Sequence, residues 1–289
     1  MLRADVWSWL PSGDVVRVSP GGEGAWYQAC VHPDGDHVVF WGGVDGEPPR
    51  LWRSSTDGRG PAEPLTGTES AARHPSYGAA GDRIAFVSDR DGGRSPTTMA
   101  EENPSGGPPA GNQWHVFTMA PDGTDVRQVT GGDHREQRPA MSPDGLTIAF
   151  VSDRGFGVWL VPSDGSAEPR QVAGDDFLYR PWWSVDGSSL FAFRYTQERR
   201  QSGRIDLARE RWAPLDNDDT GNTHGPYADL RGDRLLVHCD REGRWALWEV
   251  PLDGSPMVKL RPPGHEERVV AHGTRARNGI VTFDEAGMP

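Results

Sequence analysis

The sequence of 289 residues predicts an all-β protein, a six-bladed β-propeller with four-stranded antiparallel blades. Three observations lead to this fold class. The chain contains 37 Gly and 25 Pro, which favours frequent turns over long helices. A turn glycine followed by an apolar, β-branched run recurs along the chain. The distance between its copies is that of a propeller blade.

The repeated unit is clearest in residues 142–174, SPDGLTIAFVSDRGFGVWLVPSDGSAEPRQVAG. SPDG has the residue order of a type I turn, because proline supplies the fixed φ of the second position and glycine closes the turn. LTIAFV and GVWLV are rich in residues that favour strands, and PSDG is a second turn. With the strand before SPDG and a fourth strand in EPRQVAG, one unit is a four-stranded antiparallel meander.

Other copies of the turn and its apolar run are HPDGDHVVF, AAGDRIAF, SVDGSSLFAF, LRGDRLLVH and ARNGIVTF. Apart from one longer step, from the second to the third, the turn glycines lie about 42 to 47 residues apart. These glycines are Gly35, Gly81, Gly145, Gly187, Gly232 and Gly279. The predicted fourth strand recurs independently at Val18, Leu65, Val129, Val172, Leu215 and Leu260. Both patterns predict six blades.

The strand order at the two ends of the chain predicts how the ring closes. The first copy of the fourth strand precedes any first strand, and nothing follows the last hairpin, ARNGIVTF, to supply a third or fourth strand. Strands within residues 5–19 are therefore expected to complete the last blade, which removes the free sheet edges. Residues 1–289 are expected to form a single domain. Residues 91–113 are expected to be an insertion on the funnel face, either a disordered loop or a lid over a ligand.

The repeats resemble those of a known family. MSPDGLTIAFVSDR, WSVDGSSLFAF and HPDGDHVVF look like the repeats of the TolB-like propellers, also called WD40-like or PD40 repeats, and the resemblance covers nearly the whole chain. It implies a six-bladed propeller. It leaves the activity open, because this fold hosts adaptors, peptidase gates and lyases.

Composition and missing motifs argue against several classes of function. A net charge of −12 argues against nucleic-acid binding, which needs a basic surface. No segment has the roughly 20 apolar residues that span a bilayer, and MLRADVWSWL lacks a basic start followed by an apolar segment. We therefore expect a cytoplasmic protein that does not bind membranes. GxSxG, P-loop and CxxC motifs are absent, and no nucleotide cofactor is expected. Cys30 and Cys239 are expected to be buried free thiols.

Candidate site residues come from the position where each innermost strand starts, because this end should line the central funnel and ligand sites are concave. Aligning the repeats places one residue of each blade at this position. Most are polar, and His224 adjoins the glycine of the fifth blade. The six are Gln28, His74, Arg138, Arg180, Gly225 and His272.

Imidazole and amide groups on one side of this ring predict a cation site, and guanidinium groups on the other side predict an anion site. Imidazoles with an amide oxygen suit a divalent Mn, Fe, Zn or Ni ion, and these ligand types resemble those of oligogalacturonate lyases, another TolB-like group. Arg138 and Arg180 on adjacent blades suit a carboxylate or phosphate. The expected metal ligands are His74, His224, His272 and Gln28.

Two classes of function fit these residues. The first is an enzyme of the lyase, epimerase or dehydratase type that acts on a small anionic molecule with the help of the metal. The second is a non-enzymatic propeller that binds a protein or peptide across the funnel. Polar funnel residues that only hold water are the simpler alternative. For the enzyme, the expected catalytic residues are His74, His272, Tyr27 and Tyr179, and the expected substrate-binding residues are Arg138, Arg180 and Trp182.

Overall fold

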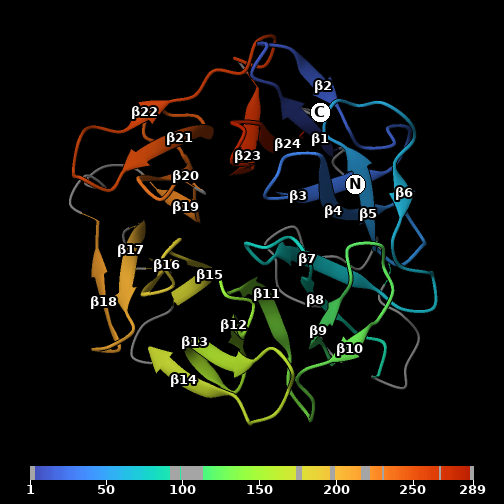
Figure 1. Ribbon diagram of the computed structural model, residues 1–289. Helices are drawn as coiled ribbons and strands as arrows, with labels where there is room; N and C mark the ends of the chain where they lie inside the picture. Colours follow the sequence, from blue (N-terminus) through green and yellow to red (C-terminus); the bar gives the residue numbers. More distant parts are fainter. Residues whose placement is uncertain are drawn as a thin grey trace.

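Six four-stranded antiparallel sheets form a ring in the computed structural model, with their innermost strands toward the centre (Figure 1). The structure describes residues 4–91, 98, 113–173, 178–195, 199–215, 222–229, 231–266 and 268–286. The predicted six-bladed β-propeller is confirmed. Within the described ranges there is no helix with the length and apolar character needed to cross a membrane.

Each of the first three blades is a meander in which the chain runs from the channel outward. Their outermost strands have only two to four residues, as short edge strands that resist unwanted pairing do. Blade one comprises β3 (Ala25–Val31), β4 (His37–Gly43), β5 (Arg50–Ser55) and β6 (Glu63–Pro64). Blade two comprises β7 (Ala72–Tyr77), β8 (Ile84–Ser88), β9 (His115–Met119) and β10 (Arg127–Gln128). Blade three comprises β11 (Glu136–Met141), β12 (Thr147–Ser152), β13 (Gly155–Pro162) and β14 (Arg170–Ala173).

The remaining blades follow the same order, except that the last takes its two outer strands from the start of the chain. Blade four comprises β15 (Leu178–Trp183), β16 (Ser189–Tyr195), β17 (Arg200–Asp206) and β18 (Arg211–Pro214). Blade five comprises β19 (Thr223–Ala228), β20 (Arg234–Cys239), β21 (Ala246–Pro251) and β22 (Val258–Lys259). Blade six comprises β23 (Val269–Arg275), β24 (Val281–Ala286), β1 (Ala4–Trp9) and β2 (Val15–Arg17).

All six predicted turn glycines join an innermost strand to the second strand of its blade. Their φ angles lie between 71° and 90°, in the left-handed region that only glycine adopts without strain. Each glycine donates its backbone N–H to the carbonyl three residues earlier, as Gly145 does to Ser142 at 2.9 Å. The repeated glycine is therefore a requirement of the hairpin backbone.

Ring closure follows the predicted arrangement, with the two ends of the chain in one blade (Figure 1). β1 pairs with β24 along its whole length, from Ala4 opposite Ala286 to Trp9 opposite Val281. Val6 of β1 is fully buried, and its carbonyl accepts the backbone N–H of Val18 at 2.9 Å. Hydrophobic side chains fill the spaces between neighbouring blades. For example, Phe86 and Phe117 of blade two pack in one cluster with Val39 of blade one.

Most of the predicted insertion, residues 92–97 and 99–112, lies outside the described residues. The expectation that it is a lid or a disordered loop stays a prediction. Both cysteines are buried free thiols, as expected.

Removing residues 1–20 is expected to disrupt folding. The deletion takes away β1 and β2, exposes the edge of β24 and removes the buried Val6 and Val18 from the core. We expect an aggregating or molten product, measured by size-exclusion chromatography and near-UV circular dichroism. A truncated protein that stays monomeric and melts as the full chain does would contradict this account of closure.

Candidate functional site

Every innermost strand carries a β-bulge at the same point, and the bulge places the predicted funnel residues. In each blade one extra residue enters the inner strand, as between Gln137 and Ala140, which lie opposite Val151 and Ala149 of β12. The same shift occurs in the other five blades. The first bulged residue has a positive φ in all six strands. These φ angles are 51° for Gln28, 56° for His74, 54° for Arg138, 54° for Arg180, 65° for Gly225 and 49° for His272.

Backbone strain is concentrated at this ring. A side chain at positive φ costs about 1 to 2 kcal/mol relative to the right-handed region. Five of the seven described non-glycine residues with positive φ belong to the ring, and the other two, Asp125 and Glu210, lie toward the outer edges of blades two and four. Such strain persists only where surrounding contacts hold it, and it is typical of functional sites.

The bulges free backbone N–H groups that then bind the preceding blade. Three residues after the positive-φ position, the N–H of Met141 donates to Ser76 Oγ at 3.3 Å, and that of Val31 donates to Thr274 Oγ1 at 3.1 Å. The N–H of Tyr77 donates in the same way to Cys30 Sγ at 3.4 Å. These bonds connect the inner strands of blades six, one, two and three in succession.

Arg138 and Arg180 lie in the channel as predicted, and both are buried, with 8% and 7% exposure. No carboxylate in the described part of the chain forms an ion pair with either one. Nε and Nη1 of Arg138 and Nε of Arg180 are buried without a hydrogen-bond partner there. Arg180 Nη1 donates to the Tyr227 hydroxyl at 3.4 Å. Burial and the neighbouring Arg180 lower the pKa of Arg138 to about 9, and the guanidinium still carries its charge at neutral pH.

The carboxylates that follow the second strands are engaged elsewhere. Asp153 accepts the backbone N–H of Arg135 at 2.9 Å, and Asp89 accepts that of Ala71 at 2.8 Å. Asp240 likewise accepts the backbone N–H of Asn222 at 2.7 Å. Each of these carboxylates fixes the start of the inner strand of its own blade, so none neutralises the funnel arginines.

Two imidazoles share the channel with these guanidinium groups. His74 is 4% exposed, and its Nδ1 accepts the backbone N–H of Arg138 at 3.4 Å. His272 Nδ1 lies 2.7 and 2.9 Å from the two carboxylate oxygens of Asp284. Burial, together with the positive charges of Arg138 and Arg180, holds the pKa of both imidazoles well below the usual value, so both are neutral. Burial raises the pKa of Asp284 to about 7.

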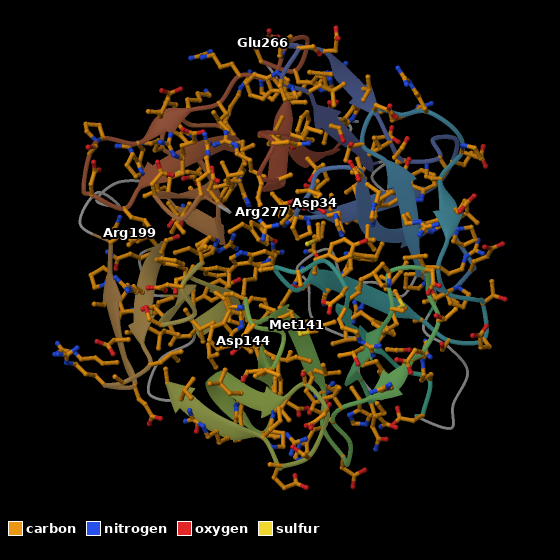
Figure 2. The ribbon with its side chains drawn as sticks, viewed as in Figure 1. Asp34, Met141, Asp144, Arg199, Glu266 and Arg277 are labelled. Atoms are coloured by element: carbon orange, nitrogen blue, oxygen red, sulfur yellow. The ribbon has the colours of Figure 1, made fainter. Side chains whose placement is uncertain are left out.

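A pocket opens beside the two arginines and His74, and a second one lies toward the hairpin face of the channel. Figure 2 shows Asp34, Arg277 and Met141 near the centre of the ring, whereas Arg199 and Glu266 lie toward its periphery. The first cavity is lined by Gln28, His74, Arg138, Arg180, Trp182 and Tyr227, among others. Tyr77, Met141, Trp183 and Arg277 are among the residues that line the second.

Trp182 lines the first cavity as expected, whereas the two predicted tyrosines are not among its lining residues. Tyr179 donates its hydroxyl hydrogen to Gln137 Oε1 at 2.5 Å, and the ring of Tyr27 packs against Trp41 at 5.0 Å. Tyr227 is the tyrosine that lines the cavity, and it packs edge-on against Trp182 at 4.9 Å. The catalytic role of Tyr27 and Tyr179 stays a prediction.

The predicted metal site stays a prediction, because no metal site is seen among the described residues and the side chain of one expected ligand is not described. No group of three or more His, Cys, Asp or Glu side chains with metal-binding geometry occurs among the residues that the structure describes. Gln28 Oε1 already accepts the indole N–H of Trp41 at 3.0 Å. Both His74 and His272 are in the field of two guanidinium groups, which repel a cation. The side chain of His224 lies outside the described part, so its role as a ligand stays a prediction.

Sequence reasoning missed three residues of the site, namely Asp284, His238 and Tyr227. The first two occupy equivalent positions, because each lies in the second strand of its blade opposite the residue before the bulge. The ring of His238 lies 4.9 Å from that of His272. Aligning the second strands would have revealed Asp284 and His238, because a polar residue there replaces an apolar one. The equivalent residues of blades two and three are Val87 and Val151.

No protein-family model matches the chain. A stretch of 113 residues is 29% identical to a Bacillus subtilis (strain 168) protein described as "Uncharacterized peptidase YuxL". The match covers 35% of this chain and 17% of that protein, so the chain spans only a small part of this curated relative.

Two solved structures are similar over the whole chain. The putative TolB from Agrobacterium tumefaciens has a TM-score of 0.74 and 14% identity, with 100% of both chains covered. An oligogalacturonate lyase in complex with manganese has a TM-score of 0.53 and 11% identity, with 100% of this chain and 99% of that chain covered. At such identities the likeness concerns the fold, and the chain has the six-bladed fold of the TolB-like propellers.

Proposed function

We propose that the channel binds a small anionic molecule, a carboxylate or a phosphate, between Arg138 and Arg180. The observation that carries this proposal is the pair of buried guanidinium groups on adjacent blades with donors left unpaired among the described residues. A planar guanidinium fork matches the two oxygens of a carboxylate or phosphate. A further buried guanidinium, that of Arg73, lies 3.9 Å over the ring of Trp114 and adds to the positive potential at His74.

The energetic argument is that a buried charge without a partner is costly for the protein alone. An unsatisfied buried donor costs about 1 to 3 kcal/mol, and more when it is charged. Burial first, and then the like charge of Arg180, lower the pKa of Arg138, so the second cation raises that cost further. An anionic ligand supplies the missing hydrogen bonds and the opposite charge. The net charge of −12 elsewhere makes this positive channel selective for small anions over acidic macromolecules.

The reaction that suits these groups best is proton transfer on a carboxylate substrate, as in a lyase, epimerase or dehydratase. Arg138 and Arg180 would hold the carboxylate, and one neutral imidazole would take a proton from the neighbouring carbon. A hydrogen-bond donor near the carboxylate would stabilise the negative charge that develops on its oxygens. His74 Nδ1 already accepts the backbone N–H of Arg138. His272, whose Nδ1 faces the carboxylate of Asp284, would therefore be the base.

A non-enzymatic propeller that binds a protein or peptide is the second candidate. The cavity toward the hairpin face, with Tyr77 and Trp183 in its lining, and the partial similarity to a described peptidase favour it. A divalent metal in the funnel is favoured only by the manganese complex of the similar lyase. Elemental analysis of protein purified without chelators tests it, and no step above depends on it.

Anion binding is tested by calorimetry with L-malate and inorganic phosphate, and with the neutral diamide of malate as the matched uncharged control. At least one anion is expected to bind and the diamide is not. Arg138→Met should weaken anion binding by about 1.5 to 3 kcal/mol, the usual range for hydrogen bonds to charged groups. Arg170→Met is the control, because Arg170 belongs to blade three as well but is 59% exposed on its outermost strand. Equal losses in both variants, or no binding of either anion, would contradict the proposal.

The same substitution should have the opposite effect on stability. Both Arg138 and a methionine in its place carry a Cβ at φ 54°, so the backbone strain is unchanged and the unpaired charge is removed. Arg138→Met is therefore expected to raise the free energy of unfolding by about 1 to 3 kcal/mol. Urea unfolding measures it, with Arg170→Met expected within about 0.5 kcal/mol of the unsubstituted protein. A clearly destabilised Arg138→Met protein would mean that the guanidinium has a structural partner.

A further inference from the structure

The last residue of each innermost strand lies three positions after the bulge residue, and these residues form a second layer along the channel. In blades one to four they are Val31, Tyr77, Met141 and Trp183, which we call the apolar layer. All four are among the residues that line the cavity toward the hairpin face. Since a strand rises about 3.3 Å per residue, the apolar layer lies at most about 10 Å along the strands from the bulge positions.

Blade six places a charge at the same level, but that charge is compensated within the protein. Arg275 ends its inner strand, is 8% exposed and also lines the cavity. Its guanidinium donates to Asp229 at 2.9 Å and pairs with Glu249 at 2.5 Å, and both carboxylates are buried. Arg275 therefore does not compete with Arg138 and Arg180 for an anion.

Other polar side chains in this lining also have partners in the protein. The Thr274 hydroxyl accepts a backbone N–H at 3.1 Å and lies 2.8 Å from the hydroxyl of Thr282. The Ser184 hydroxyl donates to Asp186 at 2.6 Å. The Tyr77 hydroxyl differs, because it is buried without a hydrogen-bond partner among the described residues, and a ligand could still satisfy it. The cavity therefore offers a ligand mainly apolar contacts.

The pocket beside the two channel arginines and this cavity adjoin each other. Cys30, Trp182 and Thr274 belong to the linings of both. The thiol at this boundary is uncharged at neutral pH, because burial raises the pKa of Cys30 to about 12. One ligand can thus have an anionic group on one side of the boundary and an uncharged apolar group on the other. A mainly apolar site with a few polar groups that fix the orientation is the usual design of a small-molecule site.

We propose that the channel takes an aryl-substituted carboxylate, with its carboxylate between the two channel arginines and its aromatic ring in the cavity beside Met141 and Trp183. This inference rests on the proposed anion site and names its ligand class. An aromatic ring suits this lining, because aromatic rings pack edge-on or offset against Tyr and Trp and pack favourably against methionine sulfur. A linker of two carbon atoms keeps the ring within the distance between the two layers.

Calorimetry on the full chain with three ligands tests this ligand class. Propanoate and 3-phenylpropanoate carry the same carboxylate and differ only in the phenyl group, and 3-phenylpropanamide is the uncharged counterpart. We expect 3-phenylpropanoate to bind at least ten-fold more tightly than either of the other two. An apolar group that leaves water adds affinity, and the amide lacks the charge that the arginines need.

The outcomes separate this inference from the proposed function. Equal binding of propanoate and 3-phenylpropanoate would overturn the aryl inference and leave the anion site standing. Equal binding of 3-phenylpropanoate and its amide would overturn the shared placement of the two groups. If neither acid, nor L-malate, nor phosphate binds, the anion site itself is contradicted.

Ala79 and Ala80 provide a matched pair of variants, because they are neighbours in the hairpin turn of blade two. Ala79 is partly buried and lines the cavity, whereas Ala80 is exposed and is not among the lining residues. Ala79→Phe is expected to fill the cavity and remove the ten-fold gain from the phenyl group of the ligand, while propanoate binds as before. Ala80→Phe should keep the gain. An equal gain in both variants would overturn the placement of the ring.

Crystals of the unsubstituted protein soaked in 3-(4-bromophenyl)propanoate locate the ring directly by anomalous diffraction, whether or not the variants fold. We expect the bromine peak in the cavity beside Met141 and Trp183, with the carboxylate at Arg138 and Arg180. A bromine peak on the opposite side of the bulge positions, or only on the outer surface, would overturn the inference.

Discussion

The one-residue bulge in each innermost strand is the constraint on which the channel depends. It turns the first bulged residue to a positive φ, and in five of the six blades this residue carries a side chain. It also frees the N–H groups that connect Val31, Tyr77 and Met141 to the preceding blades. The bulge thus both positions the funnel residues and supplies hydrogen bonds between neighbouring blades. The cost of about 1 to 2 kcal/mol per strained residue is offset by these inter-blade contacts.

The two arginines at the bulge positions differ from the other arginines in how their charge is compensated. Many arginines in the described part of the chain form ion pairs with carboxylates, as Arg154 does with the buried Glu136 at 3.0 Å. Arg138 and Arg180 differ, since the described carboxylates that could reach the inner strands, such as Asp153, hold backbone N–H groups instead. Two buried cations with no carboxylate partner among the described residues cost the folded protein stability. The anionic ligand proposed above would account for their presence.

The fold could be predicted from the sequence because the turn glycine and the apolar strand after it are both local patterns. A turn glycine and the strand after it occupy about ten residues, so the repeat is visible without knowledge of contacts. The positions of Gln28, His74, Arg138, Arg180 and His272 were predictable for the same reason, since they repeat at a fixed distance from that glycine. All five lie at the bulge.

The partners of these residues were harder to predict. Asp284 reaches His272 across a strand pair, and its Oδ2 accepts an N–H from Gln28, which is 256 residues away in the chain. The predicted separation into a cation half and an anion half stays a prediction, and the positive field of the two arginines at His74 and His272 was not visible in the sequence. Periodicity places residues on a ring, whereas the charge that each one experiences depends on contacts between blades.

Anomalous diffraction from crystals soaked in selenate, an anion with the shape and charge of sulfate, tests the central claim most directly. The account predicts a selenium peak in the channel between the guanidinium groups of Arg138 and Arg180, within hydrogen-bonding distance of both. Selenate bound only at exposed arginines such as Arg127, whose side chain is 64% exposed, with no peak in the channel, would contradict it.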